Sequence, residues 1–391
     1  MPSLGKSTVA ARIESDLETL RERAQFRTLE SPAGINLYSN DYLDLARDPR
    51  LRQSVLDAVP AGRSVGSTGS RLLSGNSREW EEAETEFAEF AGTEAALYFG
   101  SGYAANLGLI SAIAGRSDLI FSDALNHASL IDGIRLSGAE KIIYPHADLN
   151  FLEEALRENH AHPGAKLIVS ESVFSMDGDI APLDRLVELA ESHGAALVID
   201  EAHATGVHGP SGRGICAALG LEGRVFGCVH TCGKALASAG AFVCGSAKLR
   251  EFLINRARTF IFSTAMPPYL AGQIHAALRL AVAADDRREH LRIITDELRR
   301  GLAAAGIDCG RGSTQIIPVC LGSNEAALSV AADLQREGFA VRAIRPPTVP
   351  VGTSRVRFSL TAALSLDDVR RLAGATAAAI KAVQVTPSVH A

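Results

Sequence analysis

The sequence predicts an α/β fold in which a mostly parallel sheet lies between helices, followed by a small α+β domain at the C-terminus. The first observation is a series of short apolar runs separated by helical segments, which is the pattern expected of repeated βαβ units. The second is an apolar run, 197–200, that stops on an acid at a predicted strand end, where active groups of open α/β sheets gather. The third is a change of pattern after Gly310, where basic and apolar residues alternate over 355–360 and predict a half-buried strand.

The expected elements divide the chain into three parts. Residues 1–45 are expected to form an N-terminal helix, over 1–25, and an arm; 46–280 a large domain and 281–391 a small one. Ser77 stands where it can cap the helix that follows it, and acids fill the first turns of that helix. Further helices are expected over 182–193, 269–302, 325–337 and 366–383. Strands are expected over 95–99, 119–123, 141–144, 166–170, 197–200, 224–230, 240–245, 316–320, 340–344 and 355–360.

Composition narrows the classes of partner. The net charge is −6, from 45 acidic and 39 basic residues, which argues against nucleic acid or an anionic membrane surface as the main partner. No apolar run approaches the roughly 20 residues that cross a bilayer, and no secretory leader is seen, so we expect a cytoplasmic protein. None of the six cysteines forms a C-x-x-C pair, so we expect reduced thiols and no metal site.

Asp200, His203 and Lys234 form the candidate centre. Asp200 ends a predicted buried strand and His203 follows in the same loop, so one turn offers a fixed negative charge and a ring donor. Lys234 follows the next apolar run among glycines and small residues, which leave room for a flat group. A lysine that forms a Schiff base must be partly desolvated. The alternatives are that Asp200 only caps a helix and that Lys234 is a loop charge.

The segment from the predicted strand 95–99 into the turn Gly100-Ser101-Gly102 has the form of a phosphate site. A strand, a tight glycine turn and a helix start leave free backbone N–H groups, and the positive end of the helix dipole faces an anion. The alternative is an ordinary turn between a strand and a helix, which favours the same residues.

Several further segments stand in order along the chain: N-D-Y-L at 40–43, G-S-T-G-S-R at 66–71, N-H-A-S at 126–129, D-E-A-H-A-T-G at 200–206, T-C-G-K-A at 231–235, F-S-T-A-M-P-P at 262–268 and I-R-P-P-T-V-P at 344–350. Together they resemble the α-oxoamine synthases, which are pyridoxal-phosphate (PLP) enzymes of fold type I, the aspartate aminotransferase fold. The resemblance runs from about Asn36 to Ala363. It implies a seven-stranded sheet in the large, PLP-binding domain and a homodimer with shared active sites.

The resemblance also implies roles for individual residues. Lys234 would carry PLP, Asp200 would pair with its pyridine nitrogen, and His203 would contact the ring and its hydroxyl. His127 would stack on the ring and face the substrate. The remaining implied cofactor contacts are Thr231, Gly102 and Tyr103 at the phosphate, Ser175 on the side of the phenolic oxygen with Glu171 close by, and Thr264 at the phosphate of the neighbouring subunit. Trp80 stands where members often have His, and no role is assigned to it.

Within that family, I-R-P-P-T-V-P favours members that condense L-alanine with a pimeloyl thioester, carried by acyl carrier protein or coenzyme A, and release CO2. Lys234 would then act as general base and His127 as oxyanion donor. Arg345, in its rigid proline loop, would hold a substrate carboxylate, with Thr348 beside the acyl site. An N-terminal arginine would also reach the acyl substrate, and we favour Arg27 over its neighbours.

Three alternatives remain open. A sister activity, such as 2-amino-3-ketobutyrate ligase or 5-aminolevulinate synthase, would use a different amino acid or thioester. A non-catalytic PLP-fold partner subunit would be expected to lack the lysine, and Lys234 is present. A nicotinamide dehydrogenase would need a G-x-G-x-x-G turn with a distal acid after its first strand, and the sequence has none there.

Overall fold

The computed structural model describes residues 8–59 and 65–385, and the chain divides into two compact units. The sheet unit contains Asn40–Leu291 and Thr361–Ala363, and the terminal unit contains the chain up to Ser39, Arg292–Leu360 and the chain from Leu364. The first seven residues of the helix expected over 1–25 lie outside the described residues. The described part begins in helix α1, Thr8–Glu22.

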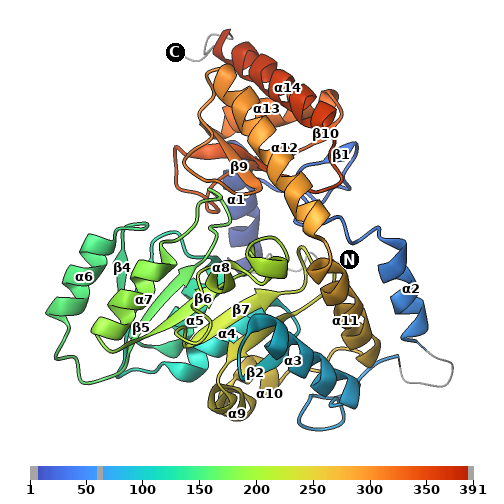
Figure 1. Ribbon diagram of the computed structural model, residues 1–391. Helices are drawn as coiled ribbons and strands as arrows, with labels where there is room; N and C mark the ends of the chain where they lie inside the picture. Colours follow the sequence, from blue (N-terminus) through green and yellow to red (C-terminus); the bar gives the residue numbers. More distant parts are fainter. Residues whose placement is uncertain (1–7, 60–64, 386–391) are drawn as a thin grey trace, which may run out of the picture. The chain divides into compact units, whose positions relative to one another are not determined.

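The sheet unit is built on one seven-stranded sheet in the order β2-β8-β7-β6-β5-β3-β4. Its strands are β2 (Ala95–Phe99), β3 (Leu119–Asp123), β4 (Glu140–Tyr144), β5 (Lys166–Glu171), β6 (Ala195–Asp200), β7 (Gly227–Thr231) and β8 (Ala241–Gly245). Strands β3 to β7 pair in parallel, whereas β8 runs antiparallel to β7 and β2. The predicted seven-stranded, mostly parallel sheet is therefore confirmed, and Figure 1 shows β5, β6 and β7 next to one another.

Helices follow most strands of this unit. They are α2 (Pro49–Asp57), α3 (Arg78–Ala91), α4 (Gly102–Ile113), α5 (Ala128–Ser137), α6 (Leu149–Glu158), α7 (Leu183–Ser192), η1 (Pro210–Gly212), α8 (Ile215–Ala218), α9 (Ala247–Arg256), α10 (Arg258–Ile261) and α11 (Pro268–Val282). Ser101 caps α4 by accepting a hydrogen bond from the backbone N–H of Ala104. Ser77 occupies the N-cap position of α3, but its side chain makes no capping hydrogen bond with the described residues.

The inner strands of the sheet are buried on both faces, as expected of a parallel sheet covered by helices, whereas the edge strand β4 is mostly exposed. Every residue of β3 and β7 is buried, and α3 turns its aromatic side onto β8. There Phe87 stacks on Phe242 with ring centroids 4.0 Å apart. This core leaves the carboxyl ends of the parallel strands as the place where polar side chains gather.

The terminal unit contains a three-stranded antiparallel sheet in the order β11-β12-β9. These strands are β9 (Ile316–Gly322), β11 (Ala343–Ile344) and β12 (Ser354–Ser359). A separate parallel pair joins β1 (Ile35–Asn36) to β10 (Phe339–Ala340). The helices of this unit are α1, α13 (Asn324–Arg336) and α14 (Leu366–Val385), and α12 (Asp285–Ala304) carries the chain from one unit into the other.

Three expectations about elements were wrong in detail. The helix expected over 269–302 is two helices, α11 and α12, because α11 ends at Val282 and two acids open the first turn of α12, where the helix dipole favours them. The strand expected over 340–344 is two short strands, β10 and β11, in different sheets. Strand β12 is almost wholly buried instead of half-buried, because it is the central strand of its sheet.

No helix in the described ranges 8–59 and 65–385 is long and apolar enough to cross a membrane.

Candidate active site

A cavity of about 270 Å³ lies in the sheet unit, at the carboxyl ends of β5, β6 and β7 and the N-terminus of α4. Open α/β sheets bind their ligands at such strand ends. The predicted site residues in its lining are Gly102, Tyr103, His127, Asp200, His203, Thr231 and Lys234. Two predicted cofactor residues, Ser175 and Thr264, are outside that lining. The lining also includes Ser101, Asn106, Ser129 and Glu171, to which the sequence analysis gave no definite role.

Asp200 supplies a fixed negative charge to the cavity. Its side chain is buried at the end of β6, and one carboxylate oxygen accepts a hydrogen bond from the backbone N–H of Ala202 at 2.8 Å. The other oxygen accepts a hydrogen bond of 2.6 Å from the side-chain amide of Asn106 on α4. Hydrogen bonds donated to a carboxylate stabilise its ionised form. The position of Asp200 therefore suits a partner that carries a positive N–H.

Lys234 and His203 are joined to a buried tyrosine. The Nζ of Lys234 lies 3.0 Å from Nε2 of His203, and Nδ1 of His203 lies 2.6 Å from the hydroxyl of Tyr42. That hydroxyl donates its single proton to Oδ1 of Asn40 at 3.1 Å. With the Tyr42 proton directed to Asn40, the matching tautomer of His203 donates from Nδ1 and presents Nε2 to Lys234 as an acceptor.

His127 occupies the N-cap position of α5 and lines the cavity. Nδ1 accepts a hydrogen bond from the backbone N–H of Ser129 at 3.2 Å and lies 2.8 Å from the Ser129 hydroxyl. Partial burial lowers the pKa of His127, and the charge of Lys234 adds to this while Asp200 opposes it. A neutral ring that accepts at Nδ1 carries its proton on Nε2. His127 therefore offers the cavity an N–H donor.

The start of α4 can receive a phosphate. Gly102 and Tyr103 open the helix, so their backbone N–H groups have no partners within it. The positive end of the helix dipole lies at the same place and also favours an anion. A Cβ on Gly102 would lie 2.7 Å from Cγ2 of Thr231, so a larger residue would close the gap between α4 and β7. With Asp200 for a ring nitrogen and Lys234 for an aldehyde, the residues present fit PLP.

The two cofactor residues that do not line the cavity have different surroundings. Ser175 is buried in the turn after β5. Thr264 is exposed in the segment before α11, where it forms an isolated antiparallel bridge with Ser70. The neighbouring Ala265 donates its backbone N–H to the carbonyl of Gly69. The segment G-S-T-G-S-R at 66–71 and the segment 263–267 therefore lie side by side within the sheet unit.

The terminal unit brings together three of the four predicted substrate residues, Arg27, Arg345 and Thr348, whereas His127 lies in the sheet unit. The Arg27 guanidinium donates to the Thr348 hydroxyl and to the carbonyl of Pro346, both at 3.4 Å. Arg345 donates to the carbonyls of Ala24 and Phe26 in the N-terminal segment.

Arg27 and Arg345 also line a cavity of about 460 Å³ in the terminal unit, together with Arg342 and apolar side chains such as Leu328. Burial, and then the charges of Arg27 and Arg342, lower the pKa of Arg345. Glu30 lines the same cavity and pairs with Arg342 at 3.3 Å, so three guanidinium groups face one carboxylate. The excess of positive charge favours an anionic ligand. Sequence reasoning missed Arg342, which stands outside the segment I-R-P-P-T-V-P.

The residues that sequence reasoning missed in the sheet unit stand inside segments that it had singled out. Tyr42 belongs to N-D-Y-L, Asn106 follows the glycine turn before α4, and Ser129 closes N-H-A-S. Ser129 acts on His127, two positions away, but Tyr42 and Asn106 act on partners far along the chain, and Asn106 and Asp200 are 94 positions apart. Only the packing of the elements reveals those partners.

Comparison with known proteins gives matches over most of the chain. The family model described as aminotransferase class I and II matches residues 32–375. An 8-amino-7-oxononanoate synthase of Anaeromyxobacter dehalogenans (strain 2CP-1 / ATCC BAA-258) is 46% identical over 90% of this chain and 91% of its own length. One of Burkholderia mallei (strain SAVP1) is 49% identical over 89% of each chain.

Solved structures are similar over the same extent. A serine palmitoyltransferase of S. paucimobilis with bound PLP has a TM-score of 0.89 at 31% identity and covers 97% of this chain and 100% of its own. The crystal structure of 8-amino-7-oxononanoate synthase from Francisella tularensis has a TM-score of 0.77 at 28% identity, over 90% of this chain and 99% of its own.

Proposed function

Because this chain belongs to the aminotransferase class I and II family, and its cofactor is PLP, we propose that it condenses L-alanine with a pimeloyl thioester to give 8-amino-7-oxononanoate and CO2. The reaction belongs to biotin synthesis. Its chemistry is supported by one arrangement above all: Lys234, His203 and Asp200 meet in a single cavity beside the N-terminus of α4. The choice of substrates rests on the relatives at 46% and 49% identity that carry the name of this synthase.

Four residues would hold the cofactor from different sides. Gly102 and Thr231 would lie at its phosphate, Asp200 at its pyridine nitrogen and Lys234 at its aldehyde carbon. When bound, PLP supplies an electron sink for the pair left at the alanine Cα. Asp200, ionised and held by two donors, would keep the pyridine nitrogen protonated and so maintain that sink.

Lys234 and His127 would move and hold protons. The Lys234 amine would take the Cα proton of alanine, and the Nε2 of His203 at 3.0 Å would orient that amine. His127 would donate its Nε2 proton in a hydrogen bond to the thioester oxygen as negative charge develops there. A donor already aimed into the cavity stabilises this charge without reorganisation, which is why the neutral ring of His127 matters.

The remaining assignments are proposals of the same kind. Arg345 and Arg27, with Thr348, would bind the carboxylate and the acyl part of the substrate, whose carrier would be acyl carrier protein or coenzyme A. The anionic preference of the cavity that the two arginines line supports this role. Ser175 would lie beside the phenolic oxygen of PLP. Thr264, exposed in the sheet unit, would reach the phosphate held by a second copy of the chain in a cytoplasmic homodimer.

A second candidate is a sister synthase that uses serine, and the serine palmitoyltransferase structure with a TM-score of 0.89 favours it. The sequence identities favour the alanine enzyme, since the serine palmitoyltransferase is 31% identical and the two named relatives reach 46% and 49%. The donor amino acid therefore separates the two candidates.

The test is to purify the protein with PLP and compare L-alanine, glycine and L-serine as donors with pimeloyl and palmitoyl thioesters, measuring CO2 release and the oxo-amine product. We expect turnover with L-alanine and pimeloyl thioester alone, and loss of both turnover and the visible band of bound PLP in Lys234→Ala. Turnover with serine and palmitoyl thioester would establish the sister activity. Failure of the wild-type protein to bind PLP at all would refute the enzyme and leave a non-catalytic subunit.

A further inference from the structure

A second acidic residue, Glu171, lies beside Asp200 in the lining of the cavity. Glu171 ends β5, and in the parallel pairing of β5 with β6 it is directly in register with Asp200. Its side chain is 3% exposed and lines the same cavity as Lys234 and His127. Two carboxyl groups so placed, in a site shielded from water, do not both ionise at neutral pH, because like charges repel and burial disfavours each charge.

The hydrogen bonds decide which of the two keeps the proton. Both oxygens of Asp200 accept a hydrogen bond, from Ala202 and Asn106, which favours its ionised form. Oε1 of Glu171 is buried and has no hydrogen-bond partner within residues 8–59 and 65–385. A buried ionised oxygen without a donor is costly, whereas a protonated carboxyl can turn its O–H toward a ligand.

Another buried acid of the same unit shows the contrast. Glu201 is fully buried, but its carboxylate accepts hydrogen bonds from the backbone N–H groups of Ile215 and Cys216 and from the hydroxyl of Ser172. The fold thus surrounds Glu201 with donors, whereas one buried oxygen of Glu171, a residue that lines the cavity, has no donor among the described residues. That difference points to a ligand as the missing partner of Glu171.

We propose that Glu171 is the proton-bearing member of the Glu171–Asp200 pair: a neutral carboxylic acid that leaves Asp200 as the ionised one and donates its O–H to the ligand in the cavity. This inference rests on the proposed function for the identity of the ligand, but the charge state concerns the protein alone. A glutamic acid here would make the cavity bind a ligand that has an acceptor oxygen beside its positive N–H.

Titratable residues from three other elements surround Glu171. Asp200 on β6 and Lys234 after β7 act on it through their charges, whereas His127, before α5, acts through its backbone N–H. Burial, and then the negative charge of Asp200, raise the pKa of Glu171 to about 8, while Lys234 and the backbone N–H groups of His127 and Ser175 act in the opposite direction. Glu171 therefore stays protonated at neutral pH and ionises in mildly alkaline solution.

The first test reads the proton directly in cofactor-free protein. Infrared difference spectra between wild type and Glu171→Gln should contain the C=O band of a protonated carboxylic acid at pH 7, and this band should vanish as the pH rises above about 8. Glu158→Gln, at an exposed position on α6, is the control and should leave the band in place. If Glu171→Gln fails to fold, Glu171→Asp, which keeps the acid but shortens its reach, should shift the band. A difference spectrum without a protonated-carboxyl band overturns the proposal.

The second test measures PLP affinity of the apo-protein by fluorescence quenching across the same pH range. If binding requires the neutral acid, the apparent affinity of wild type should fall about tenfold one pH unit above the pKa, relative to Glu171→Gln. Parallel curves for the two proteins overturn the donor role. Absence of PLP binding in both would refute the proposed function instead, and the infrared result would still stand.

Discussion

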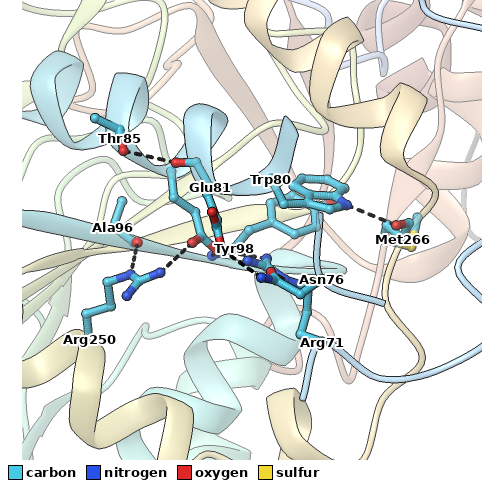
Figure 2. A network of polar contacts seen from close by, with 10 residues as sticks. Arg71, Asn76, Trp80, Glu81, Thr85, Ala96, Tyr98, Arg250 and Met266 are labelled. Carbon is cyan, nitrogen blue, oxygen red and sulfur yellow. Dashed lines mark hydrogen bonds and ion pairs between the residues drawn. The ribbon is translucent and has the colours of Figure 1, made fainter. Parts of the chain in front are cut away.

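Replacing Glu84 by glutamine should lower the stability of the sheet unit by about 3 kcal/mol. Glu84 lies on α3 with 2% of its surface exposed, and its carboxylate accepts hydrogen bonds from Arg71 and Arg250, each at 2.8 Å, and from the backbone N–H of Tyr98 at 3.0 Å. Figure 2 shows Arg71 and Arg250 converging on this helix from either side, beside Tyr98. One carboxylate thus pairs with two guanidinium groups and accepts a hydrogen bond from a strand amide.

The magnitude follows from what the substitution leaves behind. Removing one member of a buried ion pair costs about 3–5 kcal/mol, because the other charge stays buried without compensation. The side chain of Arg71 is 8% exposed and cannot reach water, whereas that of Arg250 is 35% exposed and can. Glutamine also keeps one acceptor oxygen. The cost should therefore lie at the lower end of that range.

The assay is thermal denaturation of the full chain followed by circular dichroism. For a unit of this size, a loss of about 3 kcal/mol corresponds to a fall in Tm of roughly 6–12 °C. Glu82→Gln is the matched control, since its partner Arg78 is 86% exposed on the same helix and surface pairs contribute little. A Glu84→Gln midpoint that coincides with that of Glu82→Gln would refute the reasoning that Arg71 is left as a buried, uncompensated charge.

Two further predictions concern a tautomer and a pH dependence. Tyr42→Phe removes the acceptor for Nδ1–H of His203, so kcat should fall about tenfold while the circular dichroism spectrum stays unchanged; an unchanged kcat would contradict the tautomer assignment. Burial opposes the charge of His146, but hydrogen bonds with Asp123 and Asp179 outweigh it and raise its pKa to about 10. Because that pKa exceeds the unfolded value of about 6.5, the stabilisation is complete below about pH 6.5 and is lost as the pH rises to about 10. His146→Gln should therefore lower Tm more at about pH 6 than near pH 10, and equal losses at both would show that the charge of His146 contributes nothing.

Much of the sheet unit could be predicted from local pattern. The apolar run that ends at Asp200 predicted a buried strand with an acid at its end. This was possible because the length and spacing of an apolar run can be read from consecutive residues. The same reasoning failed where tertiary position overrode the pattern. The burial of β12 depends on its place as the central strand of its sheet, which the alternation of basic and apolar residues does not encode.

The order of residues along the chain is enough to place an acid, a histidine and a lysine at strand ends and a glycine turn before a helix. How these groups act on one another depends on the folded arrangement of the strands. Tyr42 orients His203 across 161 positions, and the order of the strands places Glu171 beside Asp200. Protonation and tautomer depend on distances of about 3 Å between atoms far apart in the chain, and those distances exist only after the sheet has brought its strand ends together.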